Sequence, residues 1–294
     1  MGSLLNFSLV ALAMLAFAGN SLLCRVALKG GAIDAASFTS VRLLSGAITL
    51  GALVWWLQHK QDAQPQRPTT TTLPGDGWSA LALFVYAAGF SFAYLSMTAA
   101  TGALLLFGAV QATMIAWGLY QGERMRTLQL GGFALAVAGL TALMLPGLAT
   151  PGFGGSAAML GAGVAWGAYS LRGRRKQAHG GANNPTAVTA GNFVRTVPMA
   201  LVLSAVALPQ SHLSSSGVLY AVASGALTSG VGYAVWYRVL PTLQATHAAT
   251  VQLSVPVIAA LGGIVLLGEA ATWPMALSAC AIMGGIGLVI WNKA

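Results

Sequence analysis

Two arginines, Arg42 and Arg195, lie a turn or more inside long apolar segments of this sequence. Within a membrane an arginine costs roughly a few kcal/mol or more unless it has a partner or a polar path. Two glutamates, Glu123 and Glu269, each follow a glycine at the end of an apolar run. We predict two ion pairs, Arg42 with Glu269 and Arg195 with Glu123, that open alternately as gates. The alternative is that the arginines extend to lipid headgroups and the glutamates simply end helices.

Aromatic residues recur at helical spacing in three apolar segments: Tyr86, Phe90 and Tyr94; Trp166 and Tyr169; and Tyr233, Trp236 and Tyr237. Such stripes are often helix packing, and that interpretation stays open. Tyrosine and tryptophan also carry a polar group that needs a hydrogen-bond partner away from water, which favours a position on a cavity. A second set near segment ends is typical of the aromatic belts at membrane surfaces: Trp55, Trp56, Trp78, Trp273 and Trp291.

Uncharged polar residues in the apolar segments could bind the head group of an amino acid: Asn20, Gln111, His247, Gln252 and Ser254. An amide offers donors and an acceptor, so it can serve an ammonium and a carboxylate without burying a charge. Hydrogen bonding between helices explains any one of them equally well. Pro256 interrupts the backbone hydrogen bonds of its segment, which predicts a hinge or exposed carbonyl groups.

None of the five acidic residues lies in the middle of an apolar segment; they are Asp34, Asp62, Asp76, Glu123 and Glu269. Proton-coupled carriers usually place a carboxylate or histidine within the membrane, and here only His247 is a candidate. We therefore predict facilitated transport rather than strong proton coupling. The two cysteines lack metal-type spacing, and we expect no metal and no cofactor.

The composition is that of an integral membrane protein, with 56% hydrophobic and only 6% charged residues. Soluble domains carry about 25% charged residues. Polar and Gly-rich breaks leave ten segments near the length of about 20 residues that a membrane helix needs. We predict an all-helical protein with ten transmembrane helices: Leu4–Ala27, Ser37–Leu57, Trp78–Thr98, Gly102–Tyr120, Leu128–Leu145, Gly155–Leu171, Ala187–Leu208, Val218–Val239, Thr246–Leu267 and Trp273–Trp291. Ala16-Phe17-Ala18 is similar to a signal-peptidase cleavage site. Because residues Met1 to Phe7 include no lysine or arginine, as a signal peptide would, we expect the first segment to remain as a span.

The basic residues predict the orientation of these spans. Two polar connections, Gln58–Gly77 and Arg172–Pro185, are predicted to be loops in water. With the N-terminus inside, the inner loops and tail carry nearly all the loop lysines and arginines, whereas the outer loops hold Lys29. Because basic residues stay on the cytoplasmic side, we expect both termini in the cytoplasm of a bacterial inner membrane. The net charge of +9 is explained in this way, and we expect no nucleic-acid partner.

Short patterns of the first half recur in the same order in the second half. Gly122-Glu123 matches Gly268-Glu269, Val41-Arg42 matches Val194-Arg195, and Phe17-Ala18-Gly19 matches Trp166-Gly167-Ala168. Two copies of a five-span unit must enter the membrane from opposite sides, because five is an odd number. We predict inverted repeats over residues 1–147 and 148–294, which form a single membrane domain.

Ten spans in a five-plus-five repeat, Trp166-Gly167 near the start of the second half, and Gly-Glu after the fourth and ninth spans resemble the drug/metabolite transporter superfamily, specifically its EamA-type exporters. The placement of Arg42 and Arg195 is similar to the YddG-type exporters of aromatic amino acids. The departures are Phe17-Ala18 in place of Trp-Gly and Gln121 in place of leucine before Gly122-Glu123. The resemblance implies a cavity lined by spans one, three, four, six, eight and nine, with Trp166 as the leading substrate contact.

The resulting expectation is an exporter of aromatic and other apolar amino acids that works by alternating access and functions as a monomer. The expected substrate contacts are Trp166, Tyr94, Tyr86, Phe90, Tyr169, Asn20, Gln111, Tyr233, His247 and Gln252. An exporter of drugs or other metabolites with the same fold is the alternative. An ion channel and an intramembrane enzyme are less favoured. The filter-like Val231-Gly232-Tyr233 occurs once, within a full-length span, and no nucleophile is paired with a base.

Overall fold

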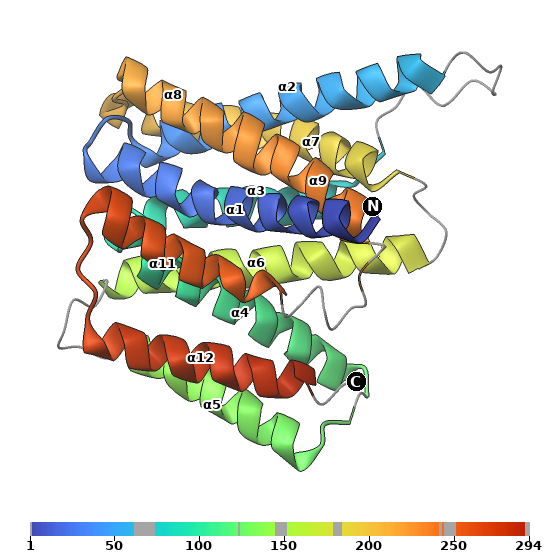
Figure 1. Cartoon of the computed structure of the whole chain (residues 1–294). Coiled ribbons are helices and arrows are strands. Elements are labelled where there is room, and N and C mark those ends of the chain that lie inside the picture. Colours follow the sequence, from blue (N-terminus) through green and yellow to red (C-terminus); the bar gives the residue numbers. More distant parts are fainter. Residues whose placement is uncertain are drawn as a thin grey trace.

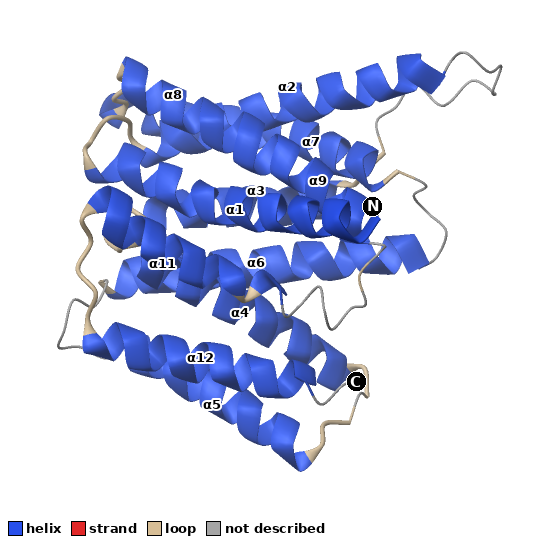
Figure 2. Cartoon of the chain, in the orientation of Figure 1, coloured by secondary structure: helices blue, strands red, loops and turns tan. Residues whose placement is uncertain are grey.

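The computed structural model describes residues 2–61, 74–122, 124–144, 152–178, 184–240, 243 and 251–291. Regular structure in this part of the chain is helical, apart from one isolated bridge between Ile33 and Leu213 (Figure 2). The helices are α1 Gly2–Lys29, α2 Ala35–Gln61, α3 Gly77–Ala93, α4 Ala99–Tyr120, α5 Thr127–Met144, α6 Phe153–Ala178, α7 Pro185–Ala207, η1 Leu208–Gln210, α8 Ser215–Ala223, η2 Ser224–Val231, α9 Gly232–Val239, α11 Ser254–Leu267 and α12 Trp273–Trp291.

The long helices lie side by side, and α1 begins at the end of the bundle where α12 finishes (Figure 1). Each segment predicted as a span contains helix in the described residues. Among the described residues, five helices are long and apolar enough, by length and composition, to cross a membrane: α1, α2, α4, α7 and the continuous run Ser215–Val239. The number of spans and the side on which the termini lie stay predictions.

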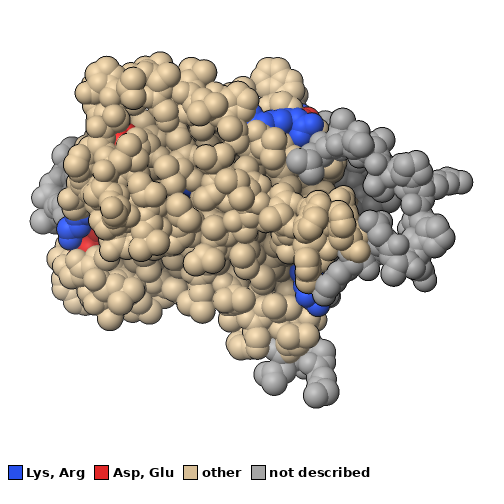
Figure 3. All heavy atoms as spheres, turned by 90° about the horizontal axis from the view of Figure 1, so that it is seen from above, with Lys and Arg blue, Asp and Glu red and all other residues tan. Residues whose placement is uncertain are grey.

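The outer surface is suited to lipid rather than water. Many leucine, valine and isoleucine side chains point outward, and on the face seen in Figure 3 the lysine, arginine and acidic side chains gather mostly toward the two ends. Trp78 and Trp273, predicted for a membrane surface, are 70% and 82% exposed at the first turns of α3 and α12. Apolar side chains facing outward along a helix bundle are what a bilayer solvates.

Three predicted boundaries were displaced. The break between the third and fourth helices lies before Thr98, whose hydroxyl caps α4 by accepting from the Thr101 amide, rather than at Ala99–Gly102. Helix α2 continues to Gln61 and α6 to Ala178, into residues predicted to be loops. Charged and polar residues can extend a helix beyond the lipid because water solvates them there.

The helices pair in a recurrent way. Helix α2 packs on α7, and α5 packs on α12. Helix α3 packs on α6, and in the same way α1 packs on the continuous run of α8, η2 and α9. Helix α4 contacts both α6 and α11. Small residues permit the closest crossing, between α5 and α12: a Cβ atom on Gly132 would lie 2.7 Å from the carbonyl oxygen of Gly285. Close approach of this kind drives helix association in lipid, where burial of apolar surface contributes little.

Candidate substrate-binding site

A polar cluster joins α1, α3 and η2 in the interior of the bundle. The amide nitrogen of Asn20 donates to the Tyr86 hydroxyl at 3.4 Å. The Asn20 amide oxygen accepts from the hydroxyls of Ser224, at 2.7 Å, and Thr228, at 3.4 Å. All four residues are buried. The predicted head-group ligand Asn20 therefore lies among polar side chains from three helices, and Ser224 and Thr228 are members that sequence reasoning missed.

The hydroxyls of Ser224, Thr228 and Ser229 are presented by a π-helical segment, η2. Glycine permits close contact with α2 here, since a Cβ atom on Gly225 would collide with the Arg42 carbonyl group and the Ser45 hydroxyl. Turns of π-helix are rare and often mark functional sites. The two Ser-Gly pairs of this segment, Ser224-Gly225 and Ser229-Gly230, were the available signal in the sequence.

Arg42 is buried beside this cluster, with 2% of its surface exposed. Its Nη2 donates to the Tyr86 hydroxyl at 3.0 Å, and its Nε donates to Ser229 Oγ at 3.4 Å. Its guanidinium carbon lies 5.2 Å from the ring centroid of Tyr86 and 4.9 Å from that of Phe90. The π faces of these rings offset part of the charge, because a cation is attracted to the negative face of an aromatic ring.

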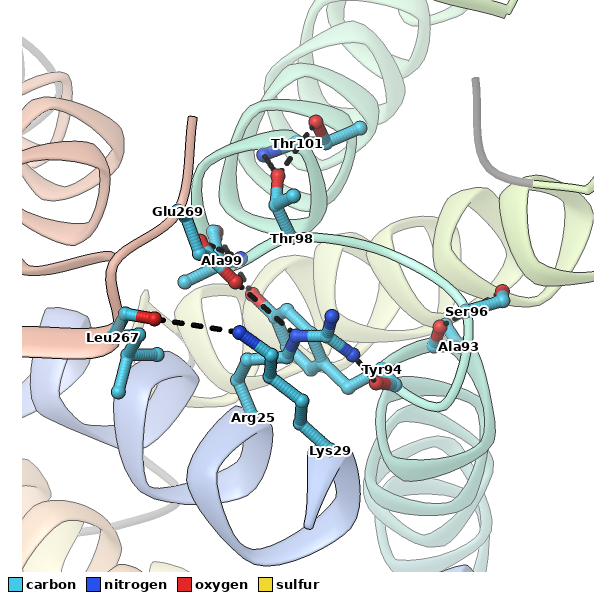
Figure 4. Close-up of polar contacts among 10 residues, drawn as sticks. All are labelled: Arg25, Lys29, Ala93, Tyr94, Ser96, Thr98, Ala99, Thr101, Leu267 and Glu269. Carbon is cyan, nitrogen blue, oxygen red and sulfur yellow. Dashed lines mark hydrogen bonds and ion pairs between the residues drawn. The ribbon is translucent and has the colours of Figure 1, made fainter. Parts of the chain in front are cut away.

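The predicted ion pair between Arg42 and Glu269 is wrong for this structure, because Glu269 pairs with Arg25 (Figure 4). Arg25 Nε lies 3.1 Å from Glu269 Oε1, and Arg25 Nη1 donates to the Tyr94 carbonyl at 2.9 Å. The other carboxylate oxygen of Glu269 accepts from the Ala99 amide at 2.8 Å, at the N-terminus of α4. Sequence reasoning missed Arg25, which lies in the last turns of the first apolar segment.

The backbone of α11 makes room for this carboxylate. Gly268 ends the helix in the left-handed conformation, with φ of 61°, and its neighbour Glu269 then donates its amide to the Gly263 carbonyl at 3.0 Å. A Cβ atom on Gly263 would lie 2.5 Å from Glu269 Oε2. Gly268 thus permits the left-handed turn that ends α11, and Gly263 leaves space for the Glu269 carboxylate.

A second ion pair closes the opposite end of the bundle, where α3 begins and α6 finishes (Figure 1). Arg172 Nη2 lies 2.9 Å from Asp76 Oδ1. Asp76 also caps α3, accepting from the Ser79 amide at 2.9 Å. Arg195, the other predicted gate residue, is half-buried and donates to the Gly191 carbonyl of its own helix at 2.9 Å. Its pairing with Glu123 stays a prediction, because Glu123 lies outside the described residues.

Aromatic rings occupy the other side of the polar cluster. The Trp166 ring stacks on Tyr86 at a centroid distance of 5.3 Å and meets Phe107 edge-on at 5.3 Å and Phe17 at 6.0 Å. Tyr233 lies 5.7 Å from Phe17. Trp166, the leading predicted contact, is therefore at the centre of an aromatic cluster that touches the polar one through Tyr86.

A small cavity lies between the two clusters. Its volume is about 10 Å³, room for roughly one water molecule. It is lined by Phe17, Asn20, Ser21, Tyr86, Phe90, Leu106, Phe107, Trp166, Thr228, Ser229 and Tyr233. The lining combines polar groups with aromatic rings, which suits an amphipathic molecule. No amino acid fits in so small a space without movement of the helices around it.

Of the ten predicted substrate contacts, Trp166, Tyr86, Phe90, Asn20 and Tyr233 line this cavity. Tyr94 is buried nearer the Arg25 end and donates to the Ala99 carbonyl at 3.3 Å. Tyr169 lies toward the other end, with Asn192 donating to its hydroxyl at 3.4 Å. Gln111 is buried and Gln252 half-buried, both outside the lining. His247 lies outside the described residues.

The predicted hinge residue, Pro256, is buried in the first turn of α11. A proline is well tolerated there, because the amide that it lacks would have no partner within the helix. The chain turns at Leu253, between helical residues 251–252 and the start of α11. A hinge at this point stays a prediction.

Comparison with known proteins gives four findings. The sequence profile of the EamA-like transporter family matches residues 153–291. An uncharacterized protein of Pseudomonas aeruginosa is 51% identical over 283 residues, which are 96% of this chain and 93% of that protein. The threonine/homoserine exporter RhtA of Salmonella typhimurium is 33% identical over 132 residues, which are 44% of this chain and 42% of the exporter. A crystal structure at 18% identity matches with a TM-score of 0.62 over 96% of this chain and 95% of its own, which shows a shared fold.

The bundle of apolar helices and the family match point to a multi-pass membrane transporter. The chain belongs to the EamA-like transporter family, within the drug/metabolite transporter superfamily, as its Gly-Glu and Trp-Gly motifs predicted.

Proposed function

We propose that this protein exports amino acids with apolar or small side chains across the bacterial inner membrane by alternating access. The observation that carries the proposal is a cavity lined both by polar side chains, Asn20 and Ser229, and by aromatic rings such as Trp166. An amino acid has the same two parts, a zwitterionic head and a side chain. The export of threonine and homoserine by the partly matching relative supports the class of substrate.

Alternating access needs two halves that move about a central site. The packing of α1 on α8–η2–α9 repeats that of α3 on α6, as inverted repeats over residues 1–147 and 148–294 would require. Both observed ion pairs join these halves, Arg25 with Glu269 at one end and Arg172 with Asp76 at the other. We propose these two pairs as the gates, in place of the predicted Arg42–Glu269 pair. In this closed form both are made, and each opens in turn.

The orientation follows from the positive-inside rule, with both termini cytoplasmic, the Arg25–Glu269 pair outside and the Arg172–Asp76 pair inside. Facilitated export is favoured over strong proton coupling, because the described residues that line the cavity include no acid and no histidine. A pH gradient that raises flux more than several-fold would contradict this part. A monomer is sufficient, since one chain carries both repeats.

The test is counterflow in proteoliposomes preloaded with unlabelled amino acid, measured separately with labelled phenylalanine and threonine. We expect accumulation with the parent protein and at least about tenfold loss in Trp166→Ala, because that ring stacks on Tyr86 and borders the cavity. Trp273→Ala is the matched control: it removes the same ring from the exposed start of α12. Its counterflow should equal that of the parent protein.

Three outcomes separate the alternatives. Counterflow of neither amino acid, with a lipophilic drug accumulating instead, would assign the protein to drug or metabolite export. Flux that does not saturate and shows no counterflow would favour a channel. Equal loss in Trp166→Ala and Trp273→Ala would remove the cavity from the transport route.

A further inference from the structure

Arg42 has an unused donor in the interior of the bundle. Its Nη1 is buried and has no hydrogen-bond partner in the described part of the protein. The other nitrogens bond to Tyr86 and Ser229, which both line the cavity. A buried donor without a partner costs about 1–3 kcal/mol, and more when it is charged. Burial of this charged donor without a partner is therefore unfavourable.

The positive charge of Arg42 also has no carboxylate opposite it among the described acidic residues. Asp34 accepts from the amides of Ser37 and His212, Asp76 pairs with Arg172, and Glu269 pairs with Arg25. Arginine stays protonated inside proteins, so this charge is permanent. The partial offset comes from the rings of Tyr86 and Phe90 and from two hydroxyls.

An arginine in this state is suited to a carboxylate ligand. The planar guanidinium presents a fork of donors that matches the two oxygens of a carboxylate, and such charge-assisted bonds are about twice as strong as neutral ones. The polar residues around it are uncharged, so nothing among the described lining residues repels an anion. A cationic drug would instead meet a like charge.

Resting on the amino-acid export proposed above, we propose that Arg42 binds the carboxylate of the transported molecule and so selects amphipathic carboxylates. Opening of the bundle lets the carboxylate reach Nη1 beside Tyr86 and Ser229. The Asn20 amide oxygen keeps the bond from Ser224 and accepts from the substrate ammonium in place of the Thr228 hydroxyl, which also donates to the Ser224 carbonyl at 2.7 Å. The side chain of the substrate lies against Trp166, Phe17 and Phe107. The bound pair neutralises the buried charge, so transport needs no accompanying proton.

The first arm of the test uses the parent protein in counterflow with labelled phenylalanine or threonine, whichever accumulates. Competitors are the unlabelled amino acid, its amide, which lacks the carboxylate, and 3-phenylpropanoate, which lacks the ammonium group. We expect the amino acid and 3-phenylpropanoate to compete, and the amide to compete at least about tenfold more weakly. An amide that competes as well as the amino acid overturns the proposal without any variant.

The second arm compares Arg42→Gln and Arg42→Lys with the parent protein. The glutamine variant should raise the KM for the amino acid about 10- to 100-fold, as expected for a lost charge-assisted pair, while its weak inhibition by the amide stays the same. Arg42→Lys keeps the positive charge but loses the paired donors of the guanidinium. Its KM should lie between those of the parent protein and Arg42→Gln. Arg238→Gln, which neutralises an exposed arginine of α9, is the matched control and should keep the parent KM.

The outcomes distinguish this inference from the proposed function. Amino-acid transport with an unchanged KM in Arg42→Gln overturns the role of Arg42 and leaves the exporter standing. Transport of 3-phenylpropanoate but of no amino acid, lost in Arg42→Gln, supports the carboxylate site and overturns amino-acid export. If the parent protein moves no carboxylate and accumulates only neutral or cationic compounds, both fail.

Discussion

Replacing Glu269 by glutamine should open one end of the bundle. The carboxylate is 5% exposed and holds two groups, the Arg25 guanidinium of α1 and the Ala99 amide at the start of α4. Glutamine keeps the size and can still accept from Ala99, but it removes the charge that both the arginine and the positive end of the α4 helix dipole favour.

The expected magnitude follows from the burial of each partner. Breaking a buried ion pair by removing one side costs about 3–5 kcal/mol. Arg25 is 13% exposed and keeps its bond to the Tyr94 carbonyl, so part of its charge stays solvated. We therefore expect the closed state to lose about 2 kcal/mol relative to the open one, which is roughly a 30-fold gain in the open population.

The reporter is a native thiol. Cys24 is fully buried in α1, directly before Arg25, whereas Cys280 is exposed and is replaced by alanine in all samples. Labelling of Cys24 by a membrane-impermeant maleimide should be about 30 times faster in Glu269→Gln. Arg25→Gln should give a smaller increase, because Glu269 then keeps its charge at the positive end of the α4 helix dipole.

A full charge swap should restore slow labelling only partly, since an arginine at position 269 would face the amide and dipole of the α4 N-terminus. Labelling of Cys24 at the parent rate in Glu269→Gln, with protein of unchanged melting temperature, would refute this gate.

Three further results are expected. Gly263→Ala places a methyl group 2.5 Å from Glu269 Oε2 and should speed labelling of the same reporter thiol; a parent rate would show that the carboxylate can shift without cost. Asp76→Asn keeps a good cap for α3 but loses the charge opposite Arg172, so a cysteine at buried Ala80 should label faster from the cytoplasmic side. Asp34→Asn should lower the melting temperature at neutral pH and flatten its fall in acid. Burial raises the pKa of Asp34, but hydrogen bonds outweigh it and hold the pKa below its ordinary value. The stabilisation is thus present above the unfolded-state pKa, about 3.9, and is lost as pH falls through the folded-state pKa.

Much of the helical architecture was predictable, because a run of apolar residues in a bilayer has almost no alternative to helix. Boundaries were less predictable where side chains decide them. The break before α4 depends on one Thr98 hydroxyl, and the extension of α6 depends on where water begins. Neither is visible in average hydrophobicity.

The site was predictable by type of residue and less so by pairing. Tyr86, Phe90 and Trp166 line the cavity, since large rings with few polar partners collect where helices face one another, and their contact with substrate stays a prediction. The predicted partner of Glu269 was wrong because the prediction used only how deep each residue lies along its helix. It did not use the direction in which the side chain points around the helix axis. Arg25 faces the α11 end, whereas Arg42 faces Tyr86 and Ser229.

The corrected pairing changes the expected mechanism. If Arg42 were paired with Glu269, opening the Glu269 end of the bundle would leave the arginine without a partner. The same residue would then serve both the substrate site and the gate. Instead Arg25 and Glu269 pair with each other at the end of the bundle, and Arg42, beside the cavity residues Tyr86 and Ser229, keeps a donor without a partner. A substrate that satisfies this donor stabilises the closed, loaded state, while opening at either end breaks only the ion pair at that end. Because substrate binding and gating use different residues, the carboxylate can stay bound to Arg42 while either end of the bundle opens. A facilitated carrier requires this.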